Sequence, residues 1–448
     1  MSIGAPRNRP NPPGPVVGLL KALSRPLLVV AVFVAVAIAF RAVGVLVVVL
    51  AIAAMIMLHE LGHFVTAKLS GMKVTEYFFG FGPRLWSVTR GETSYGVKAI
   101  PAGGYVKIVG MTMLEDVPAE DESRSYRQAS FPRRVLVASA GSLVHFLLAF
   151  VLLWSVFAFL GTQVASAPTV SGLFDIGNHA APAQLAGIKP GDVFVSVNGR
   201  PTPTFASLSS VISKSAGRPL EVVVRRRGRL VRLVVTPAPT TVTSCVSGVV
   251  QHHTKGEIGV ELSVTREVAY GPFAALPRSA GDFASLFHAT FAGLGSFFSL
   301  SGLRAFGHQV VSAGSASSSP VTPCAGVGAI GGTSGSGGGT SSGQIVSILG
   351  AVQLGSQLYS LGLSSLFIFL AFINLFVGVV NLVPMLPLDG GHVAIAVYER
   401  IRSRRRRPYH ADVAKLMPFA YIFLAFVLIL GIGALYSNIL QPVHLTGG

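Results

Sequence analysis

The sequence predicts a polytopic α-helical membrane protein with one extracytoplasmic, β-rich domain. Hydrophobic residues make up 51% of the 448 residues and charged residues only 12%, about half the charged fraction of a typical soluble domain. Four stretches reach the roughly 20 apolar residues that a spanning helix requires. This composition excludes an ordinary cytosolic enzyme and a wholly disordered chain. We assign the net charge of +17 to contacts with anionic lipid rather than with nucleic acid.

The N-terminal region combines a basic tail with a short apolar segment. Residues 1–25 form the tail, which we expect to be disordered. Residues 26–41 have two interpretations. The basic residues before them and the sequence Ala37-Ile38-Ala39 fit a cleaved signal peptide, whereas the apolar run that resumes directly after Arg41 fits a retained span. We favour the retained span, and both interpretations place Arg41 outside the cell.

Four core helices are expected in the remaining chain. They occupy residues 42–66 (core helix 1), 135–161 (core helix 2), 361–391 (core helix 3, with the loop that follows it) and 417–440 (core helix 4). Lys and Arg gather in segments 67–134 and 400–416, and short basic loops stay in the cytoplasm. The region between core helices 2 and 3 then lies outside, because long domains cross the membrane regardless of their charge.

Three regions follow core helix 2. Residues 165–238 are predicted to be β-rich, with turn signals at Pro190-Gly191-Asp192 and Asn198-Gly199 and a hairpin around Arg227-Gly228. Residues 239–311 are expected to be extracytoplasmic or juxtamembrane. Residues 312–343 are dominated by Ser and Gly and are typical of a flexible linker. Cys245 and Cys324 could form one bridge or stay free, and the sequence leaves both possibilities open.

A metal-binding pattern lies at the end of core helix 1, in His59-Glu60-Leu61-Gly62-His63. Residues i and i+4 share one face of a helix, so both imidazoles can reach one metal ion. Glu60 is rotated by about 100° from His59 and can hold the attacking water. A helix end merely solvated at the interface is the alternative. It is less favoured because ionisable groups at the end of an apolar span are costly without partners or a function.

Asp389 is the predicted third ligand, because a catalytic zinc takes three protein ligands. It follows a long uncharged run that contains Pro384 and Pro387, which break the helix, and it precedes Gly390 and Gly391. Irregular backbone at membrane depth survives only where protein or water covers it, which favours a site. An ordinary acid that caps an inner-leaflet loop would show the same pattern, so these residues alone leave both interpretations open.

These motifs together resemble the site-2 proteases, which are intramembrane zinc metalloproteases, and the similarity is greatest to actinobacterial members. The signature residues are the HExxH motif and the run from Asn381 to Gly391, NLVPMLPLDGG. The segments 80–83 and 95–105 resemble the family's membrane-associated β-loop. The segment 183–192, followed by Asn198-Gly199, resembles its extracytoplasmic PDZ domain, so the β-rich domain is expected to be PDZ-like. The resemblance covers roughly residues 43–267 and 344–440.

The resemblance implies a role for each site residue. His59, His63 and Asp389 would bind Zn²⁺, and Glu60 would be the general base that later protonates the leaving amine. Asn381 would hydrogen-bond the substrate carbonyl or its oxyanion. Independently, an Asn on an apolar helix face needs a partner, which could also be another helix.

Core helix 2 departs from the family's GPxxN pattern. Here the sequence reads Gly141-Ser142-Leu143-Val144-His145, so Ser replaces Pro and His replaces Asn. His145 could donate a hydrogen bond to substrate as an amide does, or it could be a buried packing residue. His392 is expected to pack in its loop rather than to bind metal.

The expected function is cleavage of the transmembrane segments of single-span proteins, such as anti-sigma factors, after an earlier external cut. The PDZ-like domain would contact or filter these substrates, and no nucleic acid is expected as a partner. The expected location is the plasma membrane, with the active site toward the cytoplasm. A catalytically impaired scaffold that uses the PDZ-like domain is the alternative, and His145 weakly favours it. A transporter with a buried metal is less favoured because no internal repeat is visible.

Overall fold

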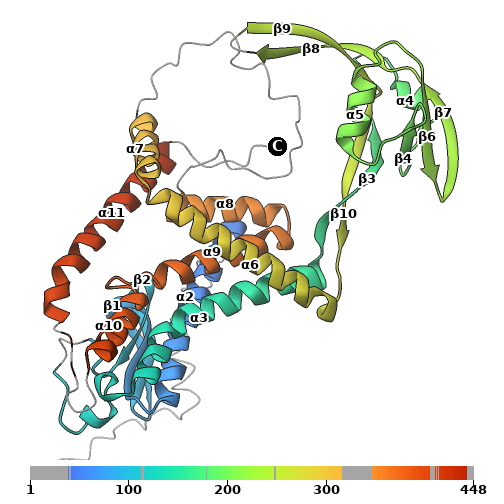
Figure 1. The fold of residues 1–448 in the computed structure, drawn as a ribbon. Coiled ribbons are helices and arrows are strands. Elements are labelled where there is room, and N and C mark those ends of the chain that lie inside the picture. Colours follow the sequence, from blue (N-terminus) through green and yellow to red (C-terminus); the bar gives the residue numbers. More distant parts are fainter. Residues whose placement is uncertain are drawn as a thin grey trace, which may run out of the picture. The chain divides into compact units, whose positions relative to one another are not determined.

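The computed structural model describes residue 39 and residues 42–440, except for 113–115, 178, 247–248, 315–345, 404–408, 410 and 412. The chain divides into two compact units, each described here by itself (Figure 1). The first unit comprises Met1–Leu153, Ser279–Val310 and Ile345–Gly448, and the second Trp154–Arg278 and Val311–Gln344. The expected tail 1–25, the segment 26–41 apart from Ala39, and linker residues 315–343 lie outside the described residues.

Four helices of the described chain are long and apolar enough to span a membrane, as predicted. They are α2 (Val43–Leu69), α3 (Phe131–Ser155, continued by the π-helix Val156–Leu160), α9 (Leu363–Asn381) and α11 (Met417–Leu440). A short helix, α8 (Ile348–Ser360), packs against α2 and α9 through a cluster that contains Val48, Leu366 and Leu370. The predicted break after core helix 3 is present, because the seven residues between α9 and α10 (Asp389–Arg402) are not helical.

The helices α6 (Pro272–Phe297) and α7 (Leu300–Gly314) were not anticipated from the sequence, which gave only an extracytoplasmic or juxtamembrane region for residues 239–311. Together they are apolar enough to form one further span or a re-entrant loop, with a 76° bend between them. Phe283 and Phe287 of α6 pack against the cluster of Ala149, Leu153 and Leu375. The first unit therefore buries part of α6 against α3 and α9.

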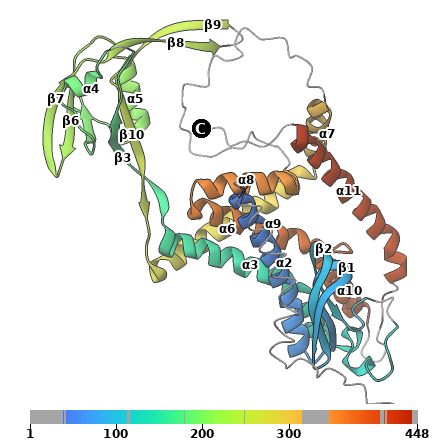
Figure 2. The same ribbon diagram turned by 180° about the vertical axis from the view of Figure 1, so that it is seen from behind.

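A long hairpin, β1 (Val74–Arg90) and β2 (Thr93–Ile108), follows α2 and lies beside it (Figure 2). Tyr77 pairs with both Val106 and Tyr95, so the start of β1 lies between two segments of β2. Close crossing requires a glycine at position 96, because an added Cβ would lie 2.2 Å from the carbonyl oxygen of Trp86. The hairpin occupies the positions where the sequence suggested a β-loop.

Ion pairs tie the hairpin to the segment that leads into α3. Glu92, in the hairpin turn, accepts hydrogen bonds from Lys68 and Arg124. These two cations lower the pKa of Glu92 to about 2. Lys73 pairs with Asp121 at 2.7 Å. The short helical turns Glu122–Arg124 and Tyr126–Gln128 complete this segment.

The second unit is built on a sheet in the order β10-β3-β4-β6-β7, with β5 paired to β4. Its elements are β3 (Thr162–Leu173), α4 (Pro182–Leu185), β4 (Val193–Val197), β5 (Arg200–Pro201), α5 (Phe205–Ser213), β6 (Leu220–Arg226), β7 (Arg229–Val235) and β10 (Val260–Val268). The strands β8 (Ala238–Val246) and β9 (Val249–Glu257) form a separate ribbon. The sheet takes in β10, so the β-rich unit continues beyond residue 238.

The turns of this sheet follow the sequence prediction. Asn198 and Arg227 have φ values of 47°, and each precedes a glycine that also has positive φ. Two consecutive residues with positive φ make the tight turns that suit two-residue hairpins. Helix α5 begins with a capping box from Thr204 and Ser207. The core between α5 and the sheet contains Phe194, Leu208 and Ile258.

Candidate metal centre

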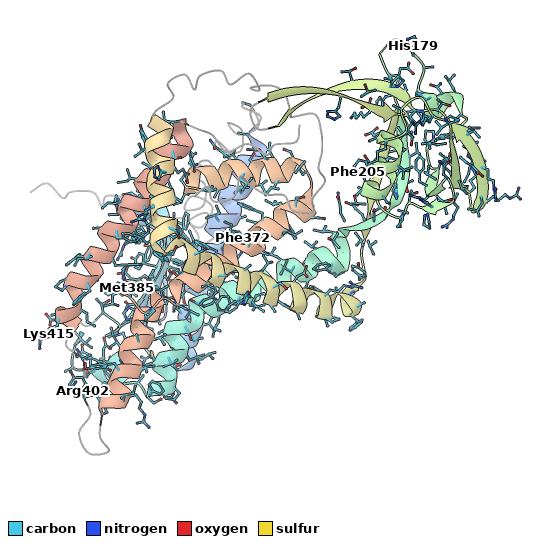
Figure 3. The ribbon with its side chains drawn as sticks, turned by 45° about the horizontal axis from the view of Figure 1, so that its top comes forward. His179, Phe205, Phe372, Met385, Arg402 and Lys415 are labelled. Carbon is cyan, nitrogen blue, oxygen red and sulfur yellow. The ribbon has the colours of Figure 1, made fainter. Side chains whose placement is uncertain are left out.

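His59, His63 and Asp389 come together in the first unit, as the sequence predicted. Their ligand atoms all lie within 4.8 Å of one another, and within the described chain they make up the candidate metal group. The two histidines are one turn apart on α2, and Asp389 is the first residue of α10. Asp389 follows the non-helical loop that contains Met385, which Figure 3 labels.

The separations among these atoms match a tetrahedral metal site. His59 Nε2 and His63 Nε2 are 3.3 Å apart, and Asp389 Oδ2 is 3.5 Å and 3.3 Å from them, respectively. Ligand atoms about 2.0–2.1 Å from a tetrahedral zinc lie roughly 3.3–3.4 Å from one another. The triangle therefore has the dimensions of one face of a zinc coordination tetrahedron, with a fourth position left for water or substrate.

The polar atoms around this triangle also favour a bound cation. Asp389 Oδ2 is buried and has no hydrogen-bond partner within the described residues, which is costly for a carboxylate oxygen. His63 Nδ1 lies 2.7 Å from the carbonyl oxygen of Val137. That bond places the imidazole proton on Nδ1 and turns the lone pair of Nε2 toward the centre, an arrangement common among metal-bound histidines. Zn²⁺ therefore fits this donor set.

Helix α3 covers the histidines at a point where only glycine fits. A Cβ at Gly141 would lie 2.2 Å from His59 Cε1 and 2.5 Å from His63 Nε2. On α2, a Cβ at Gly62 would lie 2.9 Å from the carbonyl oxygen of Ala140. These two glycines let the helices approach so closely that the imidazoles lie directly against the backbone of α3.

The glycines after Asp389 have a similar role in the loop. A Cβ at Gly390 would lie 2.3 Å from the carbonyl oxygen of Leu382, and one at Gly391 would lie 2.7 Å from the backbone nitrogen of Leu386. The close backbone approach that the sequence predicted for this pair is therefore present. It folds the loop tightly enough to direct Asp389 toward the histidines.

Glu60 lies on the face of α2 that meets the hairpin. Its carboxylate contacts the backbone amide of Val106, and its Cγ is 3.3 Å from the position that a Cβ on Gly104 would take. Tyr77 donates a hydrogen bond to the carbonyl oxygen of Met57 at 2.8 Å. The hairpin is thus fixed beside Glu60, the residue that follows His59 in the motif.

His145 has a partner that the sequence did not reveal. Its Nδ1 lies 2.9 Å from Asn374 Oδ1, and Asn374 Nδ2 donates to the carbonyl oxygen of Leu370. The amide orientation gives His145 its proton on Nδ1 and leaves Nε2 as an acceptor. The ring centroid of His145 is 5.0 Å from that of His59. The sequence feature that could have indicated this partner was Asn374, a second Asn in core helix 3, seven residues before Asn381.

Three further predicted residues lie outside the metal triangle. Asn381 is the last residue of α9, and its side-chain amide makes no hydrogen bond to any residue that the structure describes. Ser142 is fully buried, and its hydroxyl is unpaired within the same residues. His392 lines a cavity together with Leu386 and Pro387, and the packing role expected for it stays a prediction.

Sequence reasoning missed one buried ion pair near the centre. Arg134 Nη1 lies 2.6 Å from Glu399 Oε2, and both side chains are more than nine-tenths buried. This pair joins the start of α3 to α10, the helix that begins with Asp389. In the sequence, Arg134 looked like one more positive charge in a cytoplasmic loop, so no signal separated it from its neighbours.

Comparison with known proteins defines the class. The model of peptidase family M50 matches residues 47–428, which include the histidine pair, Asp389, all of α3 and α9, most of α2 and the first half of α11. The chain therefore belongs to peptidase family M50, and it is a zinc metalloprotease of the membrane.

The individual relatives agree with this class. The zinc metalloprotease Rip1 of Mycobacterium tuberculosis strain H37Rv is 34% identical over 432 residues, which cover 90% of this chain and 98% of that protein. Rip1 of Mycolicibacterium smegmatis is 34% identical over 411 residues, which cover 86% of this chain and 94% of the relative. The similarity therefore extends across both compact units.

Proposed function

We propose that this protein hydrolyses peptide bonds within the transmembrane segments of single-span proteins. The observation that carries the proposal is the His59–His63–Asp389 triangle, formed by the apolar helix α2 and the first residue of α10, with Glu60 next to it in the chain. These substrates would include anti-sigma factors already cut outside the cell, so this cleavage would be the second of two. The family and the apolar helices support a membrane substrate, and the triangle supports metal-dependent hydrolysis.

The roles of the residues follow from their placement. His59, His63 and Asp389 would hold Zn²⁺, and the chemistry that this ion would supply when bound is Lewis-acid polarisation of a peptide carbonyl and a lower pKa of water. Glu60 takes the proton of the attacking water and then gives it to the leaving amine. The contact between Glu60 and the amide of Val106 holds its carboxylate between the metal ligands and the hairpin.

The hairpin would present the substrate. A transmembrane helix hides its carbonyls in hydrogen bonds, so the scissile segment must first unwind. An unwound strand can pair with an exposed strand edge, and the segment of β2 from Gly104 to Val106 adjoins Glu60. Pairing there would place the peptide backbone within reach of the general base.

Asn381 and His145 would act on the substrate from different positions. The unpaired amide of Asn381 is available to hydrogen-bond the substrate carbonyl or its oxyanion. His145, with its proton engaged by Asn374, offers an acceptor nitrogen to substrate or water rather than a donor. His145 can therefore make a polar contact near the metal as a hydrogen-bond acceptor. The family's Asn at this position would instead donate a hydrogen bond.

The β-rich unit would work as a filter outside the plasma membrane. Its resemblance to a PDZ domain, and its position in the chain between α3 and α6, support an extracytoplasmic domain that excludes substrates with intact outer domains. The active site would then face the cytoplasm, consistent with the basic segments 67–134 and 400–416.

Comparing the membrane proteomes of cells that carry wild-type protein or Glu60→Gln tests the function. We expect shortened single-span proteins to accumulate only with the variant, because the metal ligands remain while the general base is lost. Zinc content should stay at about one per chain. Glu92→Gln is the matched control, because Glu92 pairs with Lys68 and Arg124 away from the triangle. Wild-type cleavage by Glu60→Gln would refute the mechanism.

A further inference from the structure

A cavity of about 320 Å³ in the first unit is lined by residues that precede and follow Asp389 in the chain. Its wall on α11 consists of Met417, Ala420, Tyr421 and Leu424, whose spacing of three and four residues puts them on one helix face. These side chains belong to a helix that passes the test for a membrane span. The cavity is therefore an apolar space between a spanning helix and the body of the unit.

The opposite wall connects the cavity to the metal centre. Leu386 and Pro387 precede Asp389 by three and two residues, and His392 follows it by three. Residues on both sides of this proposed metal ligand thus line the same space. A group that occupies the cavity lies against the loop that positions Asp389.

The cationic side chain in the cavity lining, Arg134, is already paired. Arg134 is 7% exposed, and its positive charge is balanced by Glu399, at 2.6 Å from Nη1. An anion in the cavity would be left without a countercharge, so the cavity suits a neutral group.

We propose that this cavity is a substrate subsite that receives a large apolar side chain from the unwound transmembrane segment. The inference rests on the proposed function, and it adds a residue preference next to the scissile bond. The apolar wall, the balanced charge and the adjoining Asp389 loop all favour a peptide over an anionic amphiphile.

The size of the cavity suits a single side chain. Its volume of about 320 Å³ is at the small end of the range of about 300–1,000 Å³ for ligand pockets. One bulky side chain of an unwound segment fits such a space.

Filling the cavity tests the proposal. Ala420→Phe places a ring in the space, and Ala425→Phe, on the same helix but outside the cavity lining, is the matched control. Each variant is expressed as the full chain, and the newly formed termini of membrane proteins are mapped by mass spectrometry. For wild type and the control, we expect a large apolar residue at one fixed distance from the cut bond.

With Ala420→Phe we expect that position to change to Ala, Gly or Ser, with cleavage of bulky substrates about tenfold lower. Zinc content should stay unchanged in Ala420→Phe and in Ala425→Phe, which separates a subsite defect from loss of the metal centre.

Three outcomes would overturn the subsite. If Glu60-dependent fragments form but their residue preference is the same with Ala420→Phe, the cavity does not hold substrate. If a lipid copurifies with wild type and not with Ala420→Phe while that preference is unchanged, the occupant is an acyl chain. If no Glu60-dependent fragments form at all, the proposed function fails, and the subsite fails with it.

Discussion

Asp192 and Asp389 are acids in different units, and their oxygens are satisfied in opposite ways. Asp192 is fully buried and accepts hydrogen bonds from Arg226 Nε at 2.8 Å, Arg226 Nη2 at 2.7 Å and the amide of Lys189 at 2.9 Å. Asp389 instead directs an unpaired oxygen at two histidine nitrogens. The first acid is complete within the protein, whereas the second needs a cation.

The pKa of Asp192 reflects this complete set of partners. Burial acts to raise it, but the Arg226 guanidinium and the Lys189 amide outweigh burial and hold the pKa below its ordinary value. A buried acid with such partners stabilises a fold. Asp192, whose oxygens are all paired within the protein, is a structural acid. Asp389, with one unpaired oxygen directed at two histidines, has the arrangement of a metal ligand.

The largest effect is expected from Asp389→Asn. The amide has nearly the shape of the acid but no charge, so we expect zinc affinity to fall by more than about 100-fold, with cleavage lost. Metal analysis after dialysis against a chelator measures the change. Asp192→Asn is the reciprocal control and should keep its zinc. Full zinc occupancy in Asp389→Asn would remove Asp389 from the ligand set.

Gly141→Ala should have the next largest effect. The added methyl group meets both imidazole rings at 2.2–2.5 Å, so α2 and α3 must separate or the rings must turn. We expect zinc affinity to fall by about 10–100-fold and the helix pair to lose about 1–3 kcal/mol. Gly431→Ala on α11 is the control, because nothing lies within 4 Å of its added methyl. Equal zinc binding by both variants would contradict this interpretation of the close approach.

Asp192→Asn should have the smallest effect on zinc binding and catalysis. It should lower the stability of the β-rich unit alone. Arg226 is 27% exposed, so solvent screens part of the ion pair. We expect the β-rich unit to lose about 1–3 kcal/mol, measured by hydrogen exchange over residues 162–268 in the full chain. If this unit is the filter, the variant should also cleave substrates that still have their outer domains. Unchanged exchange would show that the pair is dispensable.

The pH dependence of hydrogen exchange in the β-rich unit tests independently whether the ionised form of Asp192 stabilises the fold. The folded pKa of Asp192 is lower than its unfolded value, which is about 3.9. Its stabilising contribution is therefore fully present above that value and is lost as pH falls through the folded pKa. Wild-type protection should be flat from about pH 7 to 5 as far as Asp192 is concerned, and Asp192→Asn should lack the fall at lower pH.

Much of the metal centre could be predicted from the sequence because its signals are local. The spacing of His59 and His63 places them on one helix face, and two prolines and two glycines mark the irregular loop around Asp389. The close packing of α3 over the two histidines could not be predicted in the same way. Gly141 is one glycine among 51, and its role depends on how closely two helices approach.

The same limit applies to partners that are distant in the chain. Asn374 and His145 are 229 residues apart, and Arg134 and Glu399 are 265 apart, so no local pattern links them. In the β-rich unit, the turns at Asn198 and Arg227 were visible because they need special backbone angles. The pairing of β3 with β10 was not visible, because these two strands are the first and the last of the unit in the sequence.

The order of the ligands along the chain has a consequence for biosynthesis. His59 and His63 are made early, and Asp389 is made only after 388 of the 448 residues have been translated. At about 5–20 residues per second, the ribosome needs on the order of half a minute to pass from one to the other. During that interval the histidines are already in the bilayer without their acid, so the three-ligand set cannot form. A truncated or stalled chain is thereby kept inert toward the membrane proteins around it.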